Sequence, residues 1–218
     1  MKSTPIFPLP NVVLFPDTYL PLHVFEPRYR GMVVDALAGE RLITMVLARE
    51  ERPPGTSPAI HRIGSLGRIE VAEPLADGRF HIVLRGIARV ALGRVAEQPA
   101  RYWLAEIEVL AEMLPDLQDP QVADGKAGFL LTARRYGELV LQGDYAADLL
   151  NDAIPYPMLV NRAASLMRIH VSRKQRLLTL DDVGERARLA QAWMDEQIEA
   201  GLAVESFAGR RPRDPRRN

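Results

Sequence analysis

The spacing of the apolar residues changes near the middle of this chain, and that change constrains the fold more than any other feature. Up to about Leu110, apolar residues recur in short runs, often with a period of two, which is typical of β-strands. Beyond residue 121 they recur about every 3.6 residues, which is typical of helices. Residues 113–121 (MLPDLQDPQ) hold two prolines and follow neither pattern. We therefore predict an α+β protein in which residues 1–112 form a β-rich lobe and residues 113–201 form a helical bundle.

The first of these regions is predicted to form five or six short strands separated by tight turns. Asp77-Gly78 lies between two alternating runs and favours a hairpin. Strict alternation would place Ile69 and Val71 on the same inward face. This pattern predicts a small antiparallel sheet or a partly closed, barrel-like lobe. The predicted strands are residues 41–48, 66–73, 79–86, 87–93 and 101–110.

Residues typical of helix ends predict where the helices begin and end. One helix is inserted among the strands, since Pro27 suits a first helical position and Gly39 suits the position after the last turn. In the second region, Ser172 is expected to cap one helix, Asp182 to begin another and Gly201 to end it. The predicted helices of this region begin near residues 129, 144, 158, 173 and 183, and the first of them is expected to close at residue 143. Residues 202–218, with five arginines and one aspartate among the last nine, are expected to be a disordered basic tail.

The overall composition bounds the class of protein. The chain has 218 residues, of which 47% are hydrophobic and 26% charged, and its formal net charge is zero. This is the composition of a soluble globular protein without a general attraction for polyanions. There is no cysteine, so disulfides and thiolate ligands are excluded. The start of the chain lacks the apolar core of a signal peptide and no apolar run reaches membrane-spanning length, so we expect a cytoplasmic protein without a membrane partner.

Searches for catalytic and metal-binding motifs favour no chemistry. No phosphate-binding loop is present, and the nearest approach, DGKAG at Asp124, lacks the required glycine and hydroxyl. The four histidines have no metal-ligand spacing, and none of the six serines lies in a nucleophile motif. We therefore expect no catalytic residue, no metal, no cofactor and no enzymatic activity. The basic tail is the one segment that favours contact with nucleic acid, and a solvated tail explains it better.

The opening stretch supplies a resemblance to a known family. Its sequence IFPLPNVVLFPDTYLPLHVFEPRYRGMVVDAL resembles the start of the N-terminal, substrate-engaging domain of the Lon protease family. The segment HRIGSLGRIEVAEPLADGRFHIVLRGIARVAL is similar to a later part of that domain, and so is the LxxDDVxxR pattern at residues 178–186. The likeness covers about residues 6–199. The family's ATPase and protease signatures are missing, so the sequence resembles a stand-alone Lon N-terminal domain.

The resemblance implies a fold and a function. The fold would be a PUA-like β lobe packed on helices, and the function would be to bind unfolded or tagged polypeptide, alone or as an adaptor for a separate ATP-dependent protease. An exposed strand edge could accept an extended peptide without catalytic residues. A small-molecule or RNA-binding module is the alternative. The candidate peptide-binding residues are Arg52, Pro53, Pro54, Pro58, Ile60, Asp77 and Gly78.

The charged end of the opening stretch has a structural interpretation. VVLF and YLPLHVF are expected to be edge or barrel-closing strands, in which prolines lie at strand ends. Glu26 and Arg28 follow them at the passage into the helix, where an ion pair or cap would fix the corner, with Tyr29 packed between strand and helix. The residues assigned to this structural motif are Pro16, Pro21, Phe25, Glu26, Arg28 and Tyr29.

Overall fold

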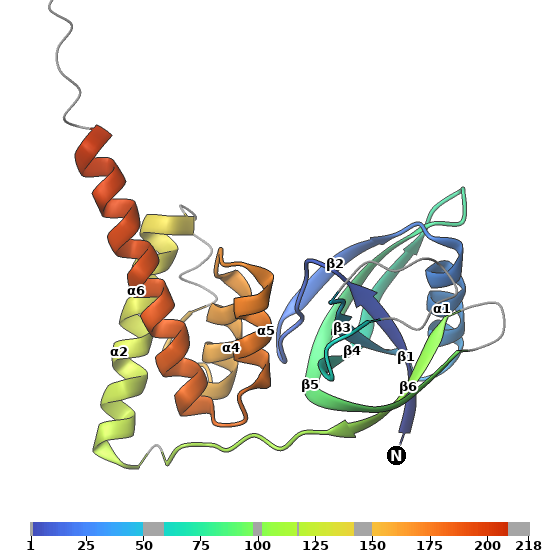
Figure 1. Ribbon diagram of the computed structural model, residues 1–218, viewed down its shortest axis with the longest axis horizontal. Helices are drawn as coiled ribbons and strands as arrows, with labels where there is room; N and C mark the ends of the chain where they lie inside the picture. The colour runs from blue at the N-terminus through green and yellow to red at the C-terminus, as the bar shows by residue number, and fades with distance from the viewer. Residues whose placement is uncertain (1, 50–58, 98–101, 117, 142–149, 209–218) are drawn as a thin grey trace, which may run out of the picture.

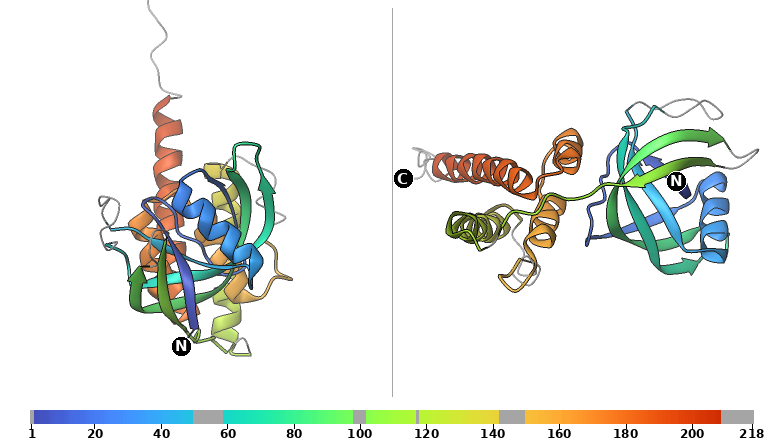
Figure 2. Two further views of the ribbon diagram at one scale, coloured as in Figure 1. Left: turned by 90° about the vertical axis from the view of Figure 1, so that its right-hand side faces the viewer. Right: turned by 90° about the horizontal axis from the view of Figure 1, so that it is seen from below.

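The computed structural model describes residues 2–49, 59–97, 102–116, 118–141 and 150–208. Two lobes lie side by side, and an extended segment along one flank connects them (Figures 1 and 2). The first lobe, here called the β lobe, holds the strands and one helix. The second, the helical lobe, holds the remaining helices. The α+β class predicted from the change in hydrophobic period is confirmed.

The β lobe is built on a six-stranded sheet with the order β2-β5-β4-β3-β1-β6, in which β5 also pairs with β6. The five strands from β5 to β6 therefore form a closed ring, in which the first and the last strand pair with each other. Strand β2 lies outside this ring and pairs with β5 alone. The sheet is thus closed in part and is not a clean barrel. All pairings are antiparallel except that of β1 with β3. The strands are β1 (Lys2–Leu9), β2 (Tyr19–Val24), β3 (Leu42–Leu47), β4 (Ile63–Pro74), β5 (Phe80–Glu97) and β6 (Trp103–Val109).

Helix α1 (Pro27–Ala38) covers the end of the β lobe that lies away from the helical lobe (Figures 1 and 2). It begins at Pro27 and Gly39 is its C-cap, as the sequence predicts. Its buried side chains recur every three or four residues, which is the spacing of one helix face. They pack on apolar side chains of the sheet and form the core of the lobe. The buried residues of α1 are Tyr29, Met32, Val33 and Ala36.

Three features of the β lobe differ from the sequence prediction. Residues 12–15 were predicted to be a strand, but they form none. The side chains of Leu14 and Phe15 are nevertheless buried, so they reach the core without strand pairing of their backbone. The strands predicted at 79–86 and 87–93 are one continuous strand, β5. Val71 is exposed instead of buried, since an irregularity in the pairing with β5 falls between Ile69 and Val71 and reverses the alternation.

The helical lobe buries one face of each helix in a shared apolar core. Phe15 of the β lobe also packs into this core, so the two lobes share apolar contacts. The elements are α2 (Pro120–Tyr136), a π-helical turn η1 (Gly137–Leu141), α4 (Tyr156–Leu166), α5 (Val171–Thr179) and α6 (Val183–Ala208).

The helix starts were predicted with mixed success. Asp182 caps α6, since its Oδ1 accepts from the Glu185 N–H at 2.9 Å. Ser172, however, is not a cap: it lies inside α5, and the ring of His170 accepts from its N–H instead. A histidine Nδ1 can accept this bond as a serine oxygen would. Helix α2 begins nine residues earlier than the predicted residue 129, because Asp119 caps it through the Gln121 N–H.

The helix ends also differ from the prediction. Helix α6 passes through Gly201 and continues to Ala208, so Gly201 does not end it. Glycine costs about 1 kcal/mol relative to alanine inside a helix, which the flanking helix-forming residues tolerate. The predicted end at Gly143, most of the predicted helix 144–153 and the arginine-rich end of the tail lie outside the described residues.

A buried charge network joins the two lobes. The side chains of Arg89 on β5 and Arg186 on α6 are both fully buried. Glu112, in the connecting segment, places one oxygen 2.7 Å from Arg186 Nη1 and 3.4 Å from Arg89 Nε. Asp181 Oδ1 accepts a hydrogen bond from Arg89 Nη2 at 2.7 Å. Burial lowers the pKa of Arg186, and the hydrogen bond from Arg186 to Glu112 opposes that effect. Two cations are therefore held by two carboxylates at the joint.

Hydrogen bonds to backbone carbonyl groups reinforce this joint. Arg89 Nη1 donates to the carbonyl oxygen of Leu178 at 3.0 Å. Gln175 on α5 donates to the carbonyl oxygen of Ile63 on β4 at 2.9 Å. The connecting segment also bonds directly to the start of α6, because the Val183 N–H donates to the carbonyl oxygen of Met113. The orientation of the lobes is thus fixed by polar contacts as well as by Phe15.

We expect Glu112→Gln to lower the free energy of unfolding by about 3 kcal/mol, because it leaves two buried guanidinium groups with one carboxylate fewer. Urea unfolding followed by circular dichroism measures this. Glu108→Gln, at an exposed position on β6, is the matched control and should change stability by less than about 0.5 kcal/mol. Equal stability of the two variants would contradict the role of Glu112.

Candidate functional site

Strand β2 is an open edge of the sheet. Among the strands that the structure describes, each of the other five has a partner on both sides, whereas β2 has β5 on one side only. An open edge presents backbone donors and acceptors that a further strand can pair with. The whole length of β2 is therefore an edge beside which an extended chain could be added.

The direction of the free backbone groups follows from the register. The Gly86 N–H on β5 donates to the carbonyl oxygen of Thr18 at 2.9 Å. Because backbone groups alternate along an antiparallel strand, those of Tyr19, Pro21 and His23 point away from β5. Pro21, which the sequence analysis places at a strand end, lies instead inside β2. Because proline has no N–H, it is tolerated at this outward position, where no bond to β5 is lost. The backbone N–H groups of Tyr19 and His23 are therefore the hydrogen-bond donors of β2 that point away from β5.

The outer face beside this edge is unusually apolar. Tyr19 is 61% exposed, Phe25 60% and Val71 55%. Pro21, Val83 and Val71 occupy paired positions on the neighbouring strands β2, β5 and β4, so they form a row across the sheet. We call these five residues the edge patch. Exposed apolar groups that gather in this way mark interaction surfaces more often than single exposed side chains do.

Polar pairs border the edge patch. The rings of His23 and His81 meet edge to face at 4.9 Å, and His81 Nδ1 lies 4.0 Å from a carboxylate oxygen of Glu73. On the other side, Arg85 Nε lies 3.4 Å from Glu70 Oε1. Within the described ranges, no group of three or more potential ligand side chains could hold a metal ion. The border is thus polar and its arginine is paired.

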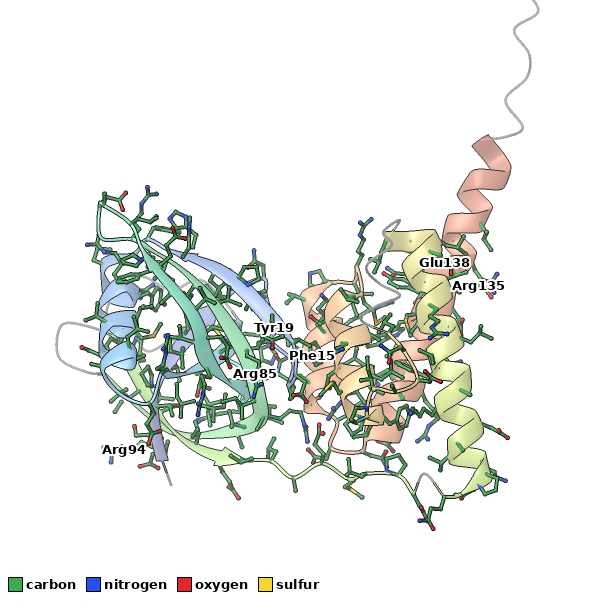
Figure 3. The ribbon with its side chains drawn as sticks, turned by 180° about the vertical axis from the view of Figure 1, so that it is seen from behind. Phe15, Tyr19, Arg85, Arg94, Arg135 and Glu138 are labelled. Atoms are coloured by element: carbon green, nitrogen blue, oxygen red, sulfur yellow. The ribbon has the colours of Figure 1, made fainter. Side chains whose placement is uncertain are left out.

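A pocket lies at the start of β2, between the two lobes. Its volume is about 160 Å³. Figure 3 shows Tyr19 on the side of the β lobe that faces the helical lobe. The carbonyl oxygen of Ser165, one of the lining residues, accepts from Lys174 at 2.6 Å, and burial lowers the pKa of this lysine. We call this cavity the interlobe pocket; its lining residues are Asp17, Thr18, Tyr19, Arg162, Ser165 and Leu166.

The edge thus runs between two landmarks. It begins at the interlobe pocket and ends at Phe25, one residue before Glu26, the N-cap of α1. The length of β2, six residues, corresponds to about 20 Å of extended chain. A peptide lying along β2 would therefore contact the pocket at one end and the exposed Phe25 ring at the other.

The structure separates the predicted peptide-binding residues. Ile60 forms a bridge with Ala48 and packs against the apolar cluster around Ile6 and Val46. Arg52, Pro53, Pro54 and Pro58 lie outside the described residues. Residues 77–78 form the turn between β4 and β5, at a different part of the lobe from Ile60.

The 77–78 turn has its own stabilising contacts. Gly78 has a φ of +78°, which glycine adopts without strain, and the guanidinium of Arg30 lies against it. Asp77 bonds to both the backbone and the side chain of Arg79, and chiefly the backbone bond lowers the pKa of Asp77. These contacts account for the conformation of the turn without a ligand. Whether it touches a peptide stays a prediction.

The motif at the end of the opening stretch forms a compact corner. Glu26 and Arg28 make an ion pair at 2.9 Å. The guanidinium of Arg28 lies over the ring of Tyr29, and the Tyr29 ring packs 4.4 Å from that of Phe7. Burial raises the pKa of Tyr29. Phe25, assigned to the same structural motif, instead projects into solvent and belongs to the edge patch.

Gly86 sets the position at which β2 begins. A Cβ atom on Gly86 would collide with the backbone carbonyl group of Phe15. The Gly86 carbonyl also accepts from the Asp17 N–H at 3.0 Å. Residues 15–18 therefore lie directly against β5 because residue 86 has no side chain. Pro16 is buried in this turn, as a structural residue would be.

Sequence analysis missed most of the edge patch. The signal was present in YLPLHVF, where Tyr19, Pro21, His23 and Phe25 alternate with apolar residues that face inward. An aromatic residue at each end of the outward set, on a strand whose central proline favours an edge, points to a binding surface. Val71 gave no such signal, because its exposure depends on the irregular pairing after Ile69.

Comparison with known proteins identifies the family. The chain matches the ATP-dependent protease La (LON) substrate-binding domain over residues 3–196, and it belongs to that family. It is 28% identical over 207 residues to the Lon protease of Flavobacterium johnsoniae, which is 90% of this chain and 24% of that protein. Lon protease 2 of Syntrophobacter fumaroxidans is 29% identical over 199 residues, 89% of this chain and 24% of that protein.

Solved structures agree with this assignment at the level of the fold. The N-terminal domain of a Lon protease from the Mycobacterium avium complex superposes with a TM-score of 0.64 at 22% identity, covering 89% of this chain and 98% of that one. A Lon N-terminal domain protein from Xanthomonas campestris gives 0.62 at 23% identity, covering 89% and 99%.

The matches cover only one part of each curated relative. The chain spans about a quarter of the length of the curated relatives, and the matched region is the substrate-binding domain, without an ATPase or a protease module. Across the described part of the chain, none of the helices has both the length and the apolar character needed to cross a membrane.

We expect Gly86→Ala to lower the free energy of unfolding by about 2 kcal/mol, because the added methyl group forces residues 15–18 away from β5. Gly31→Ala in α1 is the matched control. A Cβ there meets nothing within 4 Å, so the change should be neutral or stabilising by up to about 1 kcal/mol. Urea unfolding of both variants measures the difference. A Gly86→Ala protein as stable as the wild type would show that the close approach at residue 86 is not required.

Proposed function

We propose that this protein is a non-catalytic module that binds polypeptide in an extended conformation, by adding the polypeptide as a further strand beside β2. The open edge of β2, bordered by the edge patch, is the observation that carries the proposal. Membership in a family of substrate-binding domains supports it.

Strand addition suits a protein that must bind many sequences. Backbone donors and acceptors are the same in every polypeptide, so pairing with Tyr19 and His23 requires no particular sequence. The edge patch would add a preference for apolar side chains, which unfolded chains expose and folded ones bury. Phe25 and Val71 contribute to that preference without any charged or nucleophilic group.

The proposal also includes the biological partners of the module. The polypeptide would be an unfolded or tagged chain in the cytoplasm, and the module would act as an adaptor that presents it to a separate ATP-dependent protease. The similarity to the first quarter of Lon proteases supports this role.

The alternative is a small-molecule or RNA-binding module on a PUA-like β lobe. An RNA-binding face would carry unpaired basic residues. Beside the edge patch, Arg85 is instead paired with Glu70, and Arg79 with Asp77. This pairing favours polypeptide over RNA.

We expect His23→Pro to weaken the binding of an unfolded polypeptide at least tenfold, because proline removes an outward N–H and places ring atoms where the added strand would lie. His23→Ala removes the same side chain and keeps the N–H, so its affinity should stay within about threefold of the wild type. Fluorescence anisotropy with a labelled, permanently unfolded polypeptide measures both.

The comparison of these two variants separates the effect of the backbone N–H of residue 23 from the effect of its side chain. Neither change should disturb β5, because the backbone of residue 23 points away from it. Circular dichroism and thermal unfolding check that both variants fold. Equal affinities of His23→Pro and His23→Ala would show that β2 is not the binding edge, and wild-type protein that binds no unfolded polypeptide would refute the function itself.

A further inference from the structure

We propose that the interlobe pocket is a subsite that receives one aromatic side chain of the polypeptide bound at β2. This inference rests on the proposed function and adds to it a sequence preference at one position of the bound chain. It makes the helical lobe a part of the binding site, through the three residues that α4 contributes: Arg162, Ser165 and Leu166.

The register of an added strand leads a side chain into this pocket. Tyr19 is the first residue of β2, its backbone points outward, and its side chain lines the pocket. The residue of an added strand that lies opposite Tyr19 directs its side chain to the same face of the sheet, about 5 Å away. That side chain therefore enters the pocket, whereas side chains nearer to Phe25 do not.

The size of the pocket fits a single ring. A cavity of about 150 Å³ in another protein accepts a benzene molecule. The interlobe pocket has about 160 Å³. A phenyl or phenol group fills this space, while an alanine methyl group leaves most of it empty. A charged side chain would lose part of its hydration beside Leu166 and the Tyr19 ring.

The lining of the pocket favours an aromatic ring over an aliphatic side chain of similar size. The ring of Tyr19 offers an edge or a face to a second ring, and Arg162 is a further lining residue. A pair of rings adds to the gain from burial alone, and a guanidinium group turned towards the bound ring would add a cation–π contact. Asp17 and Ser165 supply polar atoms at the wall, which suits a tyrosine hydroxyl or an indole N–H.

Another cavity, at the far end of the β lobe's first strand, does not share this role. It has about 250 Å³ and is lined by residues of the first part of β1, the end of α1 and the start of β6, with the carboxylate groups of Asp35 and Glu40. None of its lining residues belongs to β2 or to the helical lobe. A chain lying along β2 would therefore reach the interlobe pocket and not this one.

The experiment compares two unstructured peptides of the same length that differ at one position, Phe or Ala, with the position moved along the peptide in a series. We expect the best Phe peptide to bind the wild-type protein about tenfold more tightly than its Ala counterpart. Ser165→Phe fills the pocket from within, so it should reduce this ratio below twofold and leave the affinity for the Ala peptide unchanged. Ser172→Phe, the same change at an exposed position on α5 that does not line the pocket, is the matched control and should keep the tenfold ratio.

A second variant protects the test against a misfolded Ser165→Phe protein. Tyr19 is largely exposed, so Tyr19→Ala should fold normally while removing one wall of the pocket. It should also reduce the ratio of the Phe and Ala affinities. His23→Pro, in contrast, acts on the backbone and should weaken both peptides by the same factor. A ratio that persists in Ser165→Phe and Tyr19→Ala, or a ratio of one in the wild type, would overturn the subsite.

The failure of the subsite can be told from the failure of the proposed function. If neither peptide binds the wild-type protein, the polypeptide-binding function fails, and a titration with free indole then tests the pocket alone. Indole-dependent NMR shifts at Tyr19 and Leu166 that are absent in Ser165→Phe would support an aromatic site. The absence of such shifts in the wild type would overturn it.

Discussion

Two buried arginines that share one glutamate hold this molecule together. Arg89 belongs to the β lobe and Arg186 to the helical lobe, and Glu112 lies between them in the connecting segment. Burying either guanidinium alone would cost several kcal/mol, and their mutual repulsion adds to that cost. The arrangement is stable only while Glu112 and Asp181 stay in place. The lobes are therefore held in one relative orientation, because a rotation at the joint would separate charges that have no other partners of comparable strength.

This constraint determines the geometry of the candidate site. The edge of β2 depends on the β lobe alone, since Gly86 and the 15–18 turn define where it begins. The interlobe pocket, in contrast, has walls from both lobes, and it has its observed width only at the orientation that the arginine network fixes. Phe15 connects the β2 edge with the helical lobe, because it precedes β2 in the chain and packs into the core of that lobe. Backbone pairing and side-chain selection thus depend on different parts of the same fold.

The sequence predicted the elements better than their contacts. The change of hydrophobic period located the two lobes, and Pro27 located α1, because both signals act within one or two helical turns. The contact of Arg89 and Arg186 with the same carboxylate, that of Glu112, joins residues far apart in the chain, and no local sequence pattern predicts it. Val71 was assigned to the wrong face since a single irregularity in strand pairing reverses every later side chain. The edge patch could be predicted in part, from the outward alternation around Pro21, but the pocket depends on α4 and could not.

An open strand edge is a hazard in a soluble protein, because two copies can pair through it. Pro21 lowers that hazard here. In an antiparallel pairing of two β2 strands centred on this residue, the two prolines would face each other and no N–H would be available at the centre. The outward donors of Tyr19 and His23 remain on either side, and a flexible peptide can pair with them while it bulges around the proline. Pro21 thus interrupts the edge for a rigid second copy and leaves it usable for a flexible, extended chain, to which the exposed Phe25 and Tyr19 side chains would offer apolar contacts.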